Sequence, residues 1–328
     1  MNHEHAFAPF VRILGKGKKG SRSLEREEAL EAFGMILDGE VRPEQLGAFL
    51  MLLRVKEEAP QELAGFVEAV KQRFVAPEHL EADLDWSSYA GKKNHLPWFL
   101  LSALVLAENG IRVFMHGATG HTAGRIYTEH MLPELGLQKC MDWTEVEQQL
   151  KQRNFAYMAI DQLCAPLGEI IQLRNILGLR SPVHTLCRLL NPLNSQACID
   201  GVFHPPYGPM HQKTSAMLGV ANSVTIKGDG GEAELKPDSD SQLQWVTDGQ
   251  LSEERWPRLY QQRLVKDANL SPDELLSLWR GEIEHQYGEG AVINTLAVAL
   301  KLLKKETDVE SAVARAEEMW RTRNRKLY

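Results

Sequence analysis

Apolar residues in the first 76 positions recur at intervals of three and four, the spacing that is typical of amphipathic helices. One helix is predicted between a possible N-cap at Ser23 and a stop at Gly39, with five apolar side chains on one face: Ala29, Ala32, Phe33, Ile36 and Leu37. Pro43 and Pro60 each begin a further helix, because proline is well tolerated in the first helical turn. This segment is therefore predicted to be wholly helical.

Beyond Pro77 the pattern changes to short, β-rich apolar runs separated by helical segments. The runs span residues 111–115, 155–160, 197–203 and 223–227, and a helical stretch of about 169–190 ends before Asn194. Strands that alternate with helices are typical of a largely parallel sheet. The sequence therefore predicts the α/β class: a small all-helical domain plus a larger α/β domain with a mostly parallel central sheet.

Length and composition favour a globular protein of about two domains, since 328 residues are 43% hydrophobic and 25% charged. The longest apolar run, residues 98–107, is about half of the ~20 residues that a membrane span needs. The N-terminus has no apolar signal-peptide core. Four cysteines form no Cys-x-x-Cys pair, which indicates reduced thiols. We therefore expect a cytoplasmic protein without a membrane partner.

The net charge of −7 excludes a uniformly basic nucleic-acid binder, but the basic residues are unevenly distributed. Residues 12–22 contain five basic side chains and no acid, and Arg321, Arg323 and Arg325 lie near the other end. These two patches are either contact surfaces for a polyanion or solvating charge on the chain ends.

Glycine-rich segments are candidates for ligand contacts. Residues 15–20 match Gly-x-Gly-x-x-Gly, but helices rather than a strand–helix unit surround them, so they form either a basic loop that touches phosphates or a linker. Residues 227–232 follow a predicted strand and form either the lining of a site or a tight turn. His116 and His121 lack a third ligand at a suitable spacing, which disfavours a metal site.

Five segments, in the family's order, resemble the superfamily of anthranilate phosphoribosyltransferases and pyrimidine nucleoside phosphorylases: residues 36–70, 108–117, 173–194, 224–235 and 293–303. The resemblance implies the fold of those enzymes. It also implies a helical domain of residues 1–76 with about 165–195. The α/β domain would then contain about 77–164 with 196–328.

The chain departs from this family at the positions that bind phosphoribosyl pyrophosphate. The family's Gly-Thr-Gly-Gly-Asp loop falls on Ser-Ser-Tyr-Ala-Gly at 87–91, and its acidic magnesium pair falls on Glu232-Ala233. Two polar turns are replaced by Pro97, Phe99 and Leu100, and by Met115, Ala118 and Thr119. Phe and Leu side chains cannot donate hydrogen bonds to a diphosphate. We therefore expect no catalytic residues, no cofactor and no metal; magnesium is expected only if the chain is a transferase.

The segments 89–94, 178–185 and 202–207 resemble more specifically the YbiB subgroup of that superfamily. This resemblance implies a homodimer that binds single-stranded DNA or RNA without sequence preference. The apolar faces of the three predicted N-terminal helices are wide for such short helices, so we expect the dimer to form through the helical domain. The residues expected to contact nucleic acid are all basic, with the lysine pairs at the surface: Lys16, Lys18, Lys19, Arg22, Lys92, Lys93, Arg174, Arg180, Arg188, Lys213 and Lys227. The residues expected to line the cleft are Gly91, His116, Gly117, His184, His204 and Gly228.

Other interpretations remain open at this stage. The alternative is a phosphoribosyl or other glycosyl transferase with an acceptor other than anthranilate, which the retained His116-Gly117 and Arg174 support. A dimeric scaffold with neither activity is a third hypothesis. Trp98 could stack on a base, although its place at the start of an apolar run favours core packing. On balance the sequence favours a binding protein over an enzyme.

Overall fold

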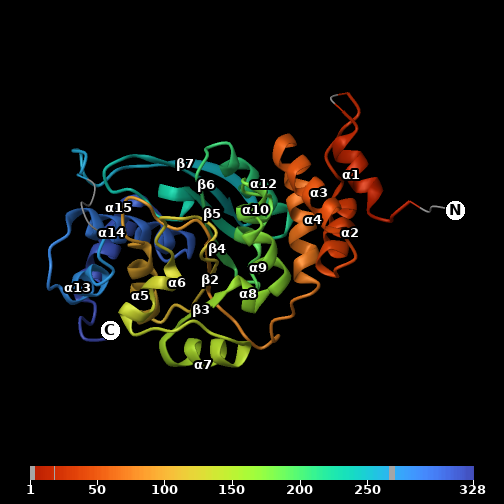
Figure 1. The fold of residues 1–328 in the computed structure, drawn as a ribbon. Coiled ribbons are helices and arrows are strands. Elements are labelled where there is room, and N and C mark those ends of the chain that lie inside the picture. Colours follow the sequence, from red (N-terminus) through yellow and green to blue (C-terminus); the bar gives the residue numbers. More distant parts are fainter. Residues whose placement is uncertain (1–3, 18, 266–269) are drawn as a thin grey trace.

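The N-terminal region is helical in the computed structural model, which describes residues 4–17, 19–265 and 270–328 (Figure 1). The helices are α1 Ala8–Gly15, α2 Arg26–Leu37, α3 Pro43–Lys56 and α4 Pro60–Lys71. The three helices expected from periodicity are confirmed, and α1 is an addition. It is only eight residues long and has no side-chain cap, so it carries little sequence signal.

The N-cap expected at Ser23 is wrong, because α2 begins two residues later. Glu25 is the N-cap, and its backbone N–H donates to Glu28 Oε2 at 2.9 Å. The Glu28 carboxylate also accepts from the Arg22 guanidinium, which fixes the chain just before the helix. A capping box therefore satisfies the first amides in place of a serine hydroxyl.

A seven-stranded sheet forms the centre of the molecule, with the order β3-β2-β1-β4-β5-β6-β7. Five strands are parallel: β1 Leu84–Ser88, β2 Val113–Gly117, β3 Phe155–Ala159, β4 Ala197–Val202 and β5 Asn222–Lys227. An antiparallel hairpin completes one edge: β6 Ser241–Thr247 and β7 Gln250–Trp256. The mostly parallel sheet is confirmed. Strand β1 escaped the pattern because its buried residues include Asp85, Ser87 and Ser88.

Helices cover both faces of this sheet. On one face a core of apolar side chains joins the sheet to α5 Phe99–Glu108, α13 Glu274–Arg280, α14 Gln286–Leu302 and α15 Val309–Thr322. Trp98 belongs to this core and is fully buried, which confirms the core-packing interpretation. The small helix α6 Thr128–Met131 and a 3-10 turn at Pro133–Leu135 pack against the same core.

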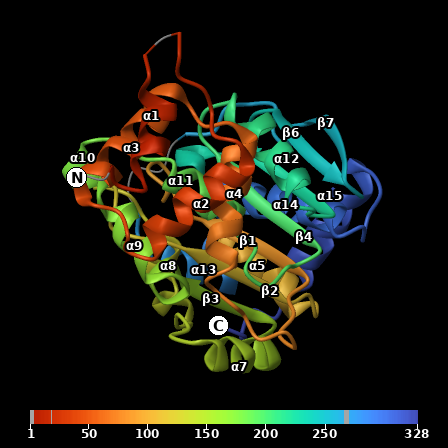
Figure 2. The same ribbon diagram turned by 90° about the vertical axis from the view of Figure 1, so that its right-hand side faces the viewer.

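A second core lies on the opposite face and joins the sheet to the N-terminal helices (Figure 2). It also includes side chains from α7 Trp143–Arg153, α8 Ile160–Leu163, α9 Ala165–Gln172 and α11 Val183–Leu186. The helix α12 Tyr207–Met217 packs beside α4. Residues far apart in sequence thus form one helical layer over the sheet.

The continuous helix expected at about 169–190 is wrong. The chain forms α9, α10 Arg174–Leu177 and α11, followed by a 3-10 turn at Cys187–Leu189. Gly178 adopts a left-handed φ of 75°, which ends α10, and Pro182 opens α11 after an extended link. This break leaves Arg174 on α10 and places Arg180 in the link between α10 and α11.

All four cysteines are free and buried, as expected for reduced thiols. Across the described ranges, no helix is long and apolar enough to cross a lipid bilayer.

The α2–α4 contact is close enough to require a glycine. A Cβ on Gly65 would lie 2.3 Å from the Arg26 carbonyl oxygen and 2.8 Å from the Leu30 amide nitrogen. A Cβ on Gly34 would instead meet the movable end of the Arg73 side chain at 2.8 Å. The two glycines therefore differ in what an added methyl displaces.

We expect Gly65→Ala to lower the free energy of unfolding by about 1–3 kcal/mol, because backbone must move. Gly34→Ala should change it by less than about 1 kcal/mol, since the gain in helix propensity offsets the displacement of Arg73. Urea unfolding monitored by circular dichroism measures both. Equal stabilities of the two variants would contradict the close-contact argument.

Candidate functional site

The carboxyl ends of β1, β2, β4 and β5 meet at one edge of the sheet, where the connecting loops form a cleft beside α9–α11. Ligands of parallel α/β sheets bind at this edge. The glycine cluster after β5 lies against the end of β1, since a Cβ on Gly230 would be 2.5 Å from the Gly91 carbonyl oxygen. The sequence left open whether residues 227–232 line a site or form a tight turn, and the structure places this segment beside the loop that follows β1.

Four arginines gather in the cleft, and each donates to a neutral oxygen. Arg125 donates to the Gly91 carbonyl at 3.2 Å, Arg180 to Thr122 Oγ1 at 3.3 Å, and Arg188 to the Gly201 carbonyl at 2.8 Å. The fourth, Arg174, donates to the His121 carbonyl. We call Arg125, Arg174, Arg180 and Arg188 the arginine cluster. Within the described ranges, none of them forms an ion pair with a carboxylate.

The arginine cluster is electrostatically strained. Burial, together with the neighbouring charges of Arg188, Arg125 and Arg174, lowers the pKa of Arg180 to about 10. Like charges repel at close range, and a bound anion would relieve that repulsion. The cluster is therefore suited to bind an anionic group such as a phosphate, which guanidinium groups contact through paired N–H donors.

Two histidines pack against the arginine cluster. His121 and His184 meet edge to face, with their ring centroids 4.9 Å apart. His121 Nε2 donates to the Tyr89 carbonyl at 2.7 Å, so Nδ1 accepts from Thr122 Oγ1 at 3.0 Å. Burial lowers the pKa of His121 to about 4, helped by the nearby arginines, and also lowers that of His184. Both rings are neutral at pH 7.

A cavity of about 90 Å³ connects the arginine cluster to the helical layer, lined by Arg180, Arg188, His184, Arg54, Glu58, Tyr207 and His204, among others. Tyr207 Oη donates to Glu58 Oε2 at 3.1 Å and accepts from Arg54 Nη1 at 3.2 Å. Burial raises the pKa of Glu58. His184 Nε2 and Ser181 Oγ are buried in the lining without a partner. The cavity thus offers unused polar atoms next to the Glu58 carboxyl group.

The carboxylates nearest the end of β1 are already engaged. Glu232 Oε1 accepts from the backbone amides of Ala90, at 2.6 Å, and Gly91. Glu234 Oε2 accepts from the Phe99 amide at 2.9 Å, and Glu234 Oε1 pairs with the Lys92 ammonium. Burial raises the pKa of Glu232, while Arg188 and the two amides lower it.

The structure corrects the expected positions of two residues. Lys92, expected at the surface, is 1% exposed, because its ammonium is enclosed with Glu234. His116, expected to line the cleft, is fully buried behind Tyr89, with Nδ1 2.7 Å from Tyr89 Oη and Nε2 3.2 Å from Asp85 Oδ1. Both were misplaced because the sequence shows polarity but not which side of a loop or strand faces the interior.

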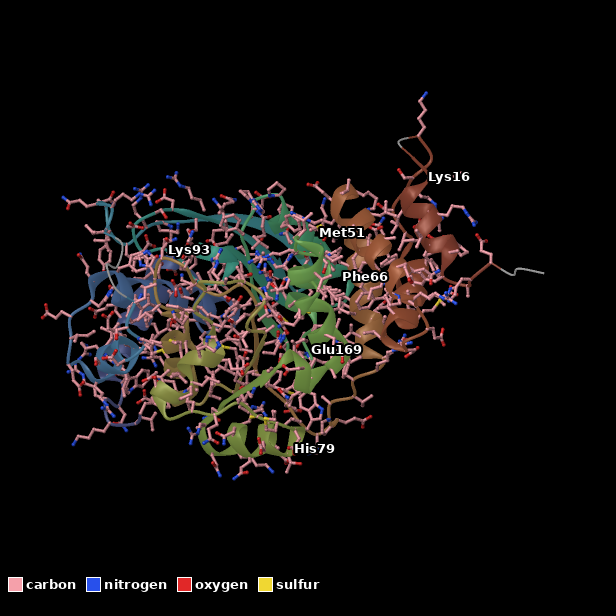
Figure 3. All side chains as sticks on the ribbon, in the orientation of Figure 1. Lys16, Met51, Phe66, His79, Lys93 and Glu169 are labelled. Carbon is pink, nitrogen blue, oxygen red and sulfur yellow. The ribbon has the colours of Figure 1, made fainter. Side chains whose placement is uncertain are left out.

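The remaining expected residues lie in several places. Gly91, Gly117 and Gly228 are buried at the strand ends, where a Cβ on any of them would clash. His184 and His204 line the cavity described above. Lys227 lines a second cavity, which shares His204 with the first. Exposed side chains outside the cavity are Lys16, Lys19, Arg22, Lys93 and Lys213, while Lys18 lies outside the described residues. Figure 3 shows Lys16 at the tip beyond α1, far from Lys93.

Sequence reasoning missed Arg125, Arg54, Glu58, Tyr207 and Glu234. Tyr207 and Glu58 are 149 positions apart, and no periodicity or spacing links them. Arg125 had a usable signal, because it follows the glycine-rich segment after a predicted strand. Over the described ranges, no group of three or more His, Cys, Asp or Glu residues could hold a metal ion.

Two family models match the chain. Residues 10–74 match the helical bundle domain of the glycosyl transferase family, and residues 98–324 match the α/β domain of that family. The first match covers the N-terminal helices of the helical layer, and the second covers most of the sheet.

Several relatives align with most of the chain. An uncharacterized protein of Aquifex aeolicus is 30% identical over 72% of this chain and 71% of its own length. An uncharacterized Escherichia coli protein, YbiB, is 25% identical, with 73% and 76% covered. An anthranilate phosphoribosyltransferase of Novosphingobium aromaticivorans is 28% identical, with 90% and 91% covered.

Solved anthranilate phosphoribosyltransferases share the fold. The enzyme from Thermus thermophilus superposes with a TM-score of 0.77 at 22% identity, over 97% of this chain and 94% of that one. The Saccharomyces cerevisiae enzyme in complex with PRPP and Mg gives 0.79 at 16% identity, over 98% and 94%. At these identities the likeness shows the fold alone.

The expectation of nucleic-acid binding is wrong on these findings. The matched models describe a glycosyl transferase family, and the relatives and structures with a stated activity are phosphoribosyltransferases. The structure explains the error. Lys92 is withdrawn into an ion pair with Glu234, and the exposed side chains of Lys16 and Lys93 lie far apart instead of forming one basic surface (Figure 3).

We expect His121→Gln to flatten the dependence of stability on pH. Unfolded His121 takes up a proton near pH 6.5, whereas the folded ring does so only near pH 4. The stability of the native protein above pH 6.5 is therefore partly lost as the pH falls toward 4, by about 3 kcal/mol for this group. Urea unfolding at pH 7, 5.5 and 4.5 measures the slope. An unchanged slope in the variant would contradict the assignment.

Proposed function

Because the chain belongs to the glycosyl transferase family, we propose that it is a transferase of the phosphoribosyltransferase class that uses an acceptor other than anthranilate. The observation that carries this proposal is the arginine cluster. Its four guanidinium groups form no ion pair with a carboxylate in the described structure, and two of them, Arg180 and Arg188, line the cavity. The cluster would hold the phosphate of a sugar donor, and the cavity beside it would receive the acceptor.

The use of anthranilate with phosphoribosyl pyrophosphate fits this chain poorly. Its backbone amides at Ala90, Gly91 and Phe99 already have carboxylate acceptors, so a diphosphate would compete with Glu232 and Glu234 for them. The departures from the family's polar turns point the same way. A singly phosphorylated region of the donor, bound by the arginines, is compatible with these contacts.

The acidic residues at this edge do not fit a magnesium site. Magnesium prefers octahedral oxygen ligands and carboxylates that are free to coordinate it. Here one oxygen of Glu232 accepts two amides, and both oxygens of Glu234 are engaged by an amide and by Lys92. The proposed transfer therefore involves no step at a metal ion.

Glu58 is suited to accept a proton from the acceptor. Transfer of a glycosyl group requires a nucleophile that loses its proton, and a base works best when its pKa lies near the working pH. Burial raises the pKa of Glu58, and Tyr207 holds one of its oxygens at 3.1 Å in the wall of the cavity. Neutral His184 presents an unused Nε2 at the same cavity, where it can orient the acceptor.

We expect orthophosphate and ribose 5-phosphate to bind the native protein, and Arg180→Gln to weaken that binding at least about tenfold, the cost of about 1.4 kcal/mol in lost charge-assisted bonds. Lys93→Ala is the matched control, because Lys93 is exposed and should leave the affinity unchanged. Isothermal titration calorimetry measures both. Equal affinities in the two variants would remove the arginine cluster from the site.

A turnover assay tests the transfer itself. Phosphoribosyl pyrophosphate with anthranilate and magnesium should give no phosphoribosyl-anthranilate above a control without protein. A panel of amine, hydroxyl and heterocyclic nitrogen acceptors, each supplied with a 5-phosphoribosyl donor that carries a single phosphate at C1, should give a glycosylated product and one equivalent of orthophosphate as the leaving group. Glu58, which would take the acceptor's proton, is required for this step, so Glu58→Gln should abolish both products in mass spectrometry. Anthranilate turnover would overturn the acceptor assignment, and no product from any acceptor would overturn the proposed activity.

We further propose that the protein is a homodimer joined through its helical layer. Ile176 is 80% exposed on α10, Leu179 is also exposed, and Leu177 lies 4.0 Å from the position of a Cβ on Gly47 of α3. Contiguous apolar surface of this kind is typical of a contact site, and a two-fold contact buries it on both copies.

We expect light scattering at micromolar concentration to give twice the 37.0 kDa mass of one chain. Ile176→Asp should shift the protein to monomer, because it places a charge in the contact. Val265→Asp, on an exposed site of the α/β domain, should leave the mass unchanged. A monomeric native protein would refute the dimer.

A further inference from the structure

We propose that the end of β1 and the start of α5 form an anion-binding cradle that the chain closes with its own carboxylates. The cradle consists of the Ala90, Gly91 and Phe99 amides and the Lys92 ammonium, and its occupants are Glu232 and Glu234. In the native protein it admits no external anion, and removal of Glu234 opens it to formate or phosphate. This inference is independent of the proposed transferase activity.

The donors of the cradle are those that recognise anions in proteins. Gly91 has a left-handed φ of 67°, and this turn directs two successive amides at one oxygen, Glu232 Oε1. Phe99 is the first residue of α5, whose N-cap Trp98 provides no side-chain acceptor. Glu234 therefore supplies from another segment the acceptor that the helix lacks, and its negative charge faces the positive end of the helix.

Burial shows that charge rather than shape holds this arrangement together. Lys92, Glu232 and Glu234 are each 1% exposed, although charged side chains are rarely buried unless they are paired. Glu232 Oε2 remains without a partner in the interior. The two carboxylates have lost their hydration, and the amides, the Lys92 ammonium and the nearby charge of Arg188 offset that loss.

The segment that carries the two carboxylates is held in place by its backbone. Gly230 and Gly231 have φ values of 69° and 99°, and a Cβ on Gly228 would lie 1.6 Å from the Glu232 carbonyl oxygen. The turn is therefore closely packed, and because the Glu232 and Glu234 side chains are each 1% exposed, they have no open space into which they could rotate. An external anion can enter only where a carboxylate has been removed.

Chemical rescue of Glu234→Ala tests the cradle. This substitution leaves a space the size of a carboxyl group beside Lys92 and the Phe99 amide. Formate, and orthophosphate at matched ionic strength, should raise the thermal unfolding midpoint of this variant in a saturable way. An anion at 100 times its dissociation constant raises the ratio of folded to unfolded chains about a hundredfold. Where the variant is unfolded without added anion, the same anions should restore cooperative unfolding.

Two control variants separate the cradle from general effects of salt or of a lost ion pair. Glu234→Gln keeps the side-chain volume and should show no formate rescue, because no space opens. Glu254→Ala breaks another lysine–glutamate pair, Glu254 with Lys301 at 2.6 Å, which is partly exposed and has no backbone amide donor in the described structure. It should be destabilised without being rescued by formate.

Three outcomes would overturn the proposal. They are the absence of a saturable formate effect in Glu234→Ala, an equal effect in Glu254→Ala, and failure of formate and phosphate to restore cooperative unfolding to an unfolded Glu234→Ala.

Isothermal titration calorimetry adds a count of the phosphate sites. Phosphate should bind the double variant Arg180→Gln with Glu234→Ala at the cradle, but should not bind Arg180→Gln alone there. A native protein that binds no phosphate would refute the proposed donor site and leave the formate rescue as evidence for the cradle.

Discussion

The contact between the Glu232 and Glu234 carboxylates and the backbone amides that follow β1 organises the functional edge of this protein. It joins the β5–β6 connection to β1 and to the start of α5, over about 140 positions of the chain. Amides left without acceptors in the interior would be costly, and so would buried carboxylates without donors. The amides can therefore be buried because the carboxylates accept from them, and the carboxylates can be buried because the amides donate to them.

This pairing determines the electrostatics of the rest of the cleft. Because Glu232 and Glu234 are engaged by amides and by Lys92, they are unavailable as close ion-pair partners of the arginine cluster, whose guanidinium groups bond to carbonyl and hydroxyl oxygens instead. The positive charge of the cluster is left for a ligand. The same engagement leaves only Glu232 Oε2 without a partner among the four oxygens of these two carboxylates, fewer than a magnesium ion requires.

The helical layer contributes the other wall of the cavity. Arg54 and Glu58 lie at and just beyond the end of α3, and Tyr207 of α12 joins both of them across the boundary with the sheet. The second apolar core keeps this boundary fixed, since it includes side chains of the N-terminal helices, of α8–α11 and of the sheet. An acceptor bound there would contact groups from both parts of the protein.

The sequence by itself determined the elements whose signals are local. Proline in the first turn and a repeat of three and four residues located α3 and α4, and apolar runs located β2–β5. Family resemblance extended this to the order of the domains. Local patterns were insufficient for α1, which is short and uncapped, and for β1, whose buried positions include an aspartate and two serines.

Only the tertiary structure decided the chemistry of the site. Lys92 and Lys93 are neighbours in a basic pair, yet one is buried with Glu234 and the other is exposed, because the chain turns between them. The arginine cluster draws on residues 125 to 188, and Glu58 meets Tyr207 across 149 positions. Whether a charged side chain is neutralised depends on partners that are distant in sequence. The pattern of charges along the chain does not show which distant residues the fold brings together. The sequence therefore showed where charge is located, and the fold decided which charges remain available to a ligand.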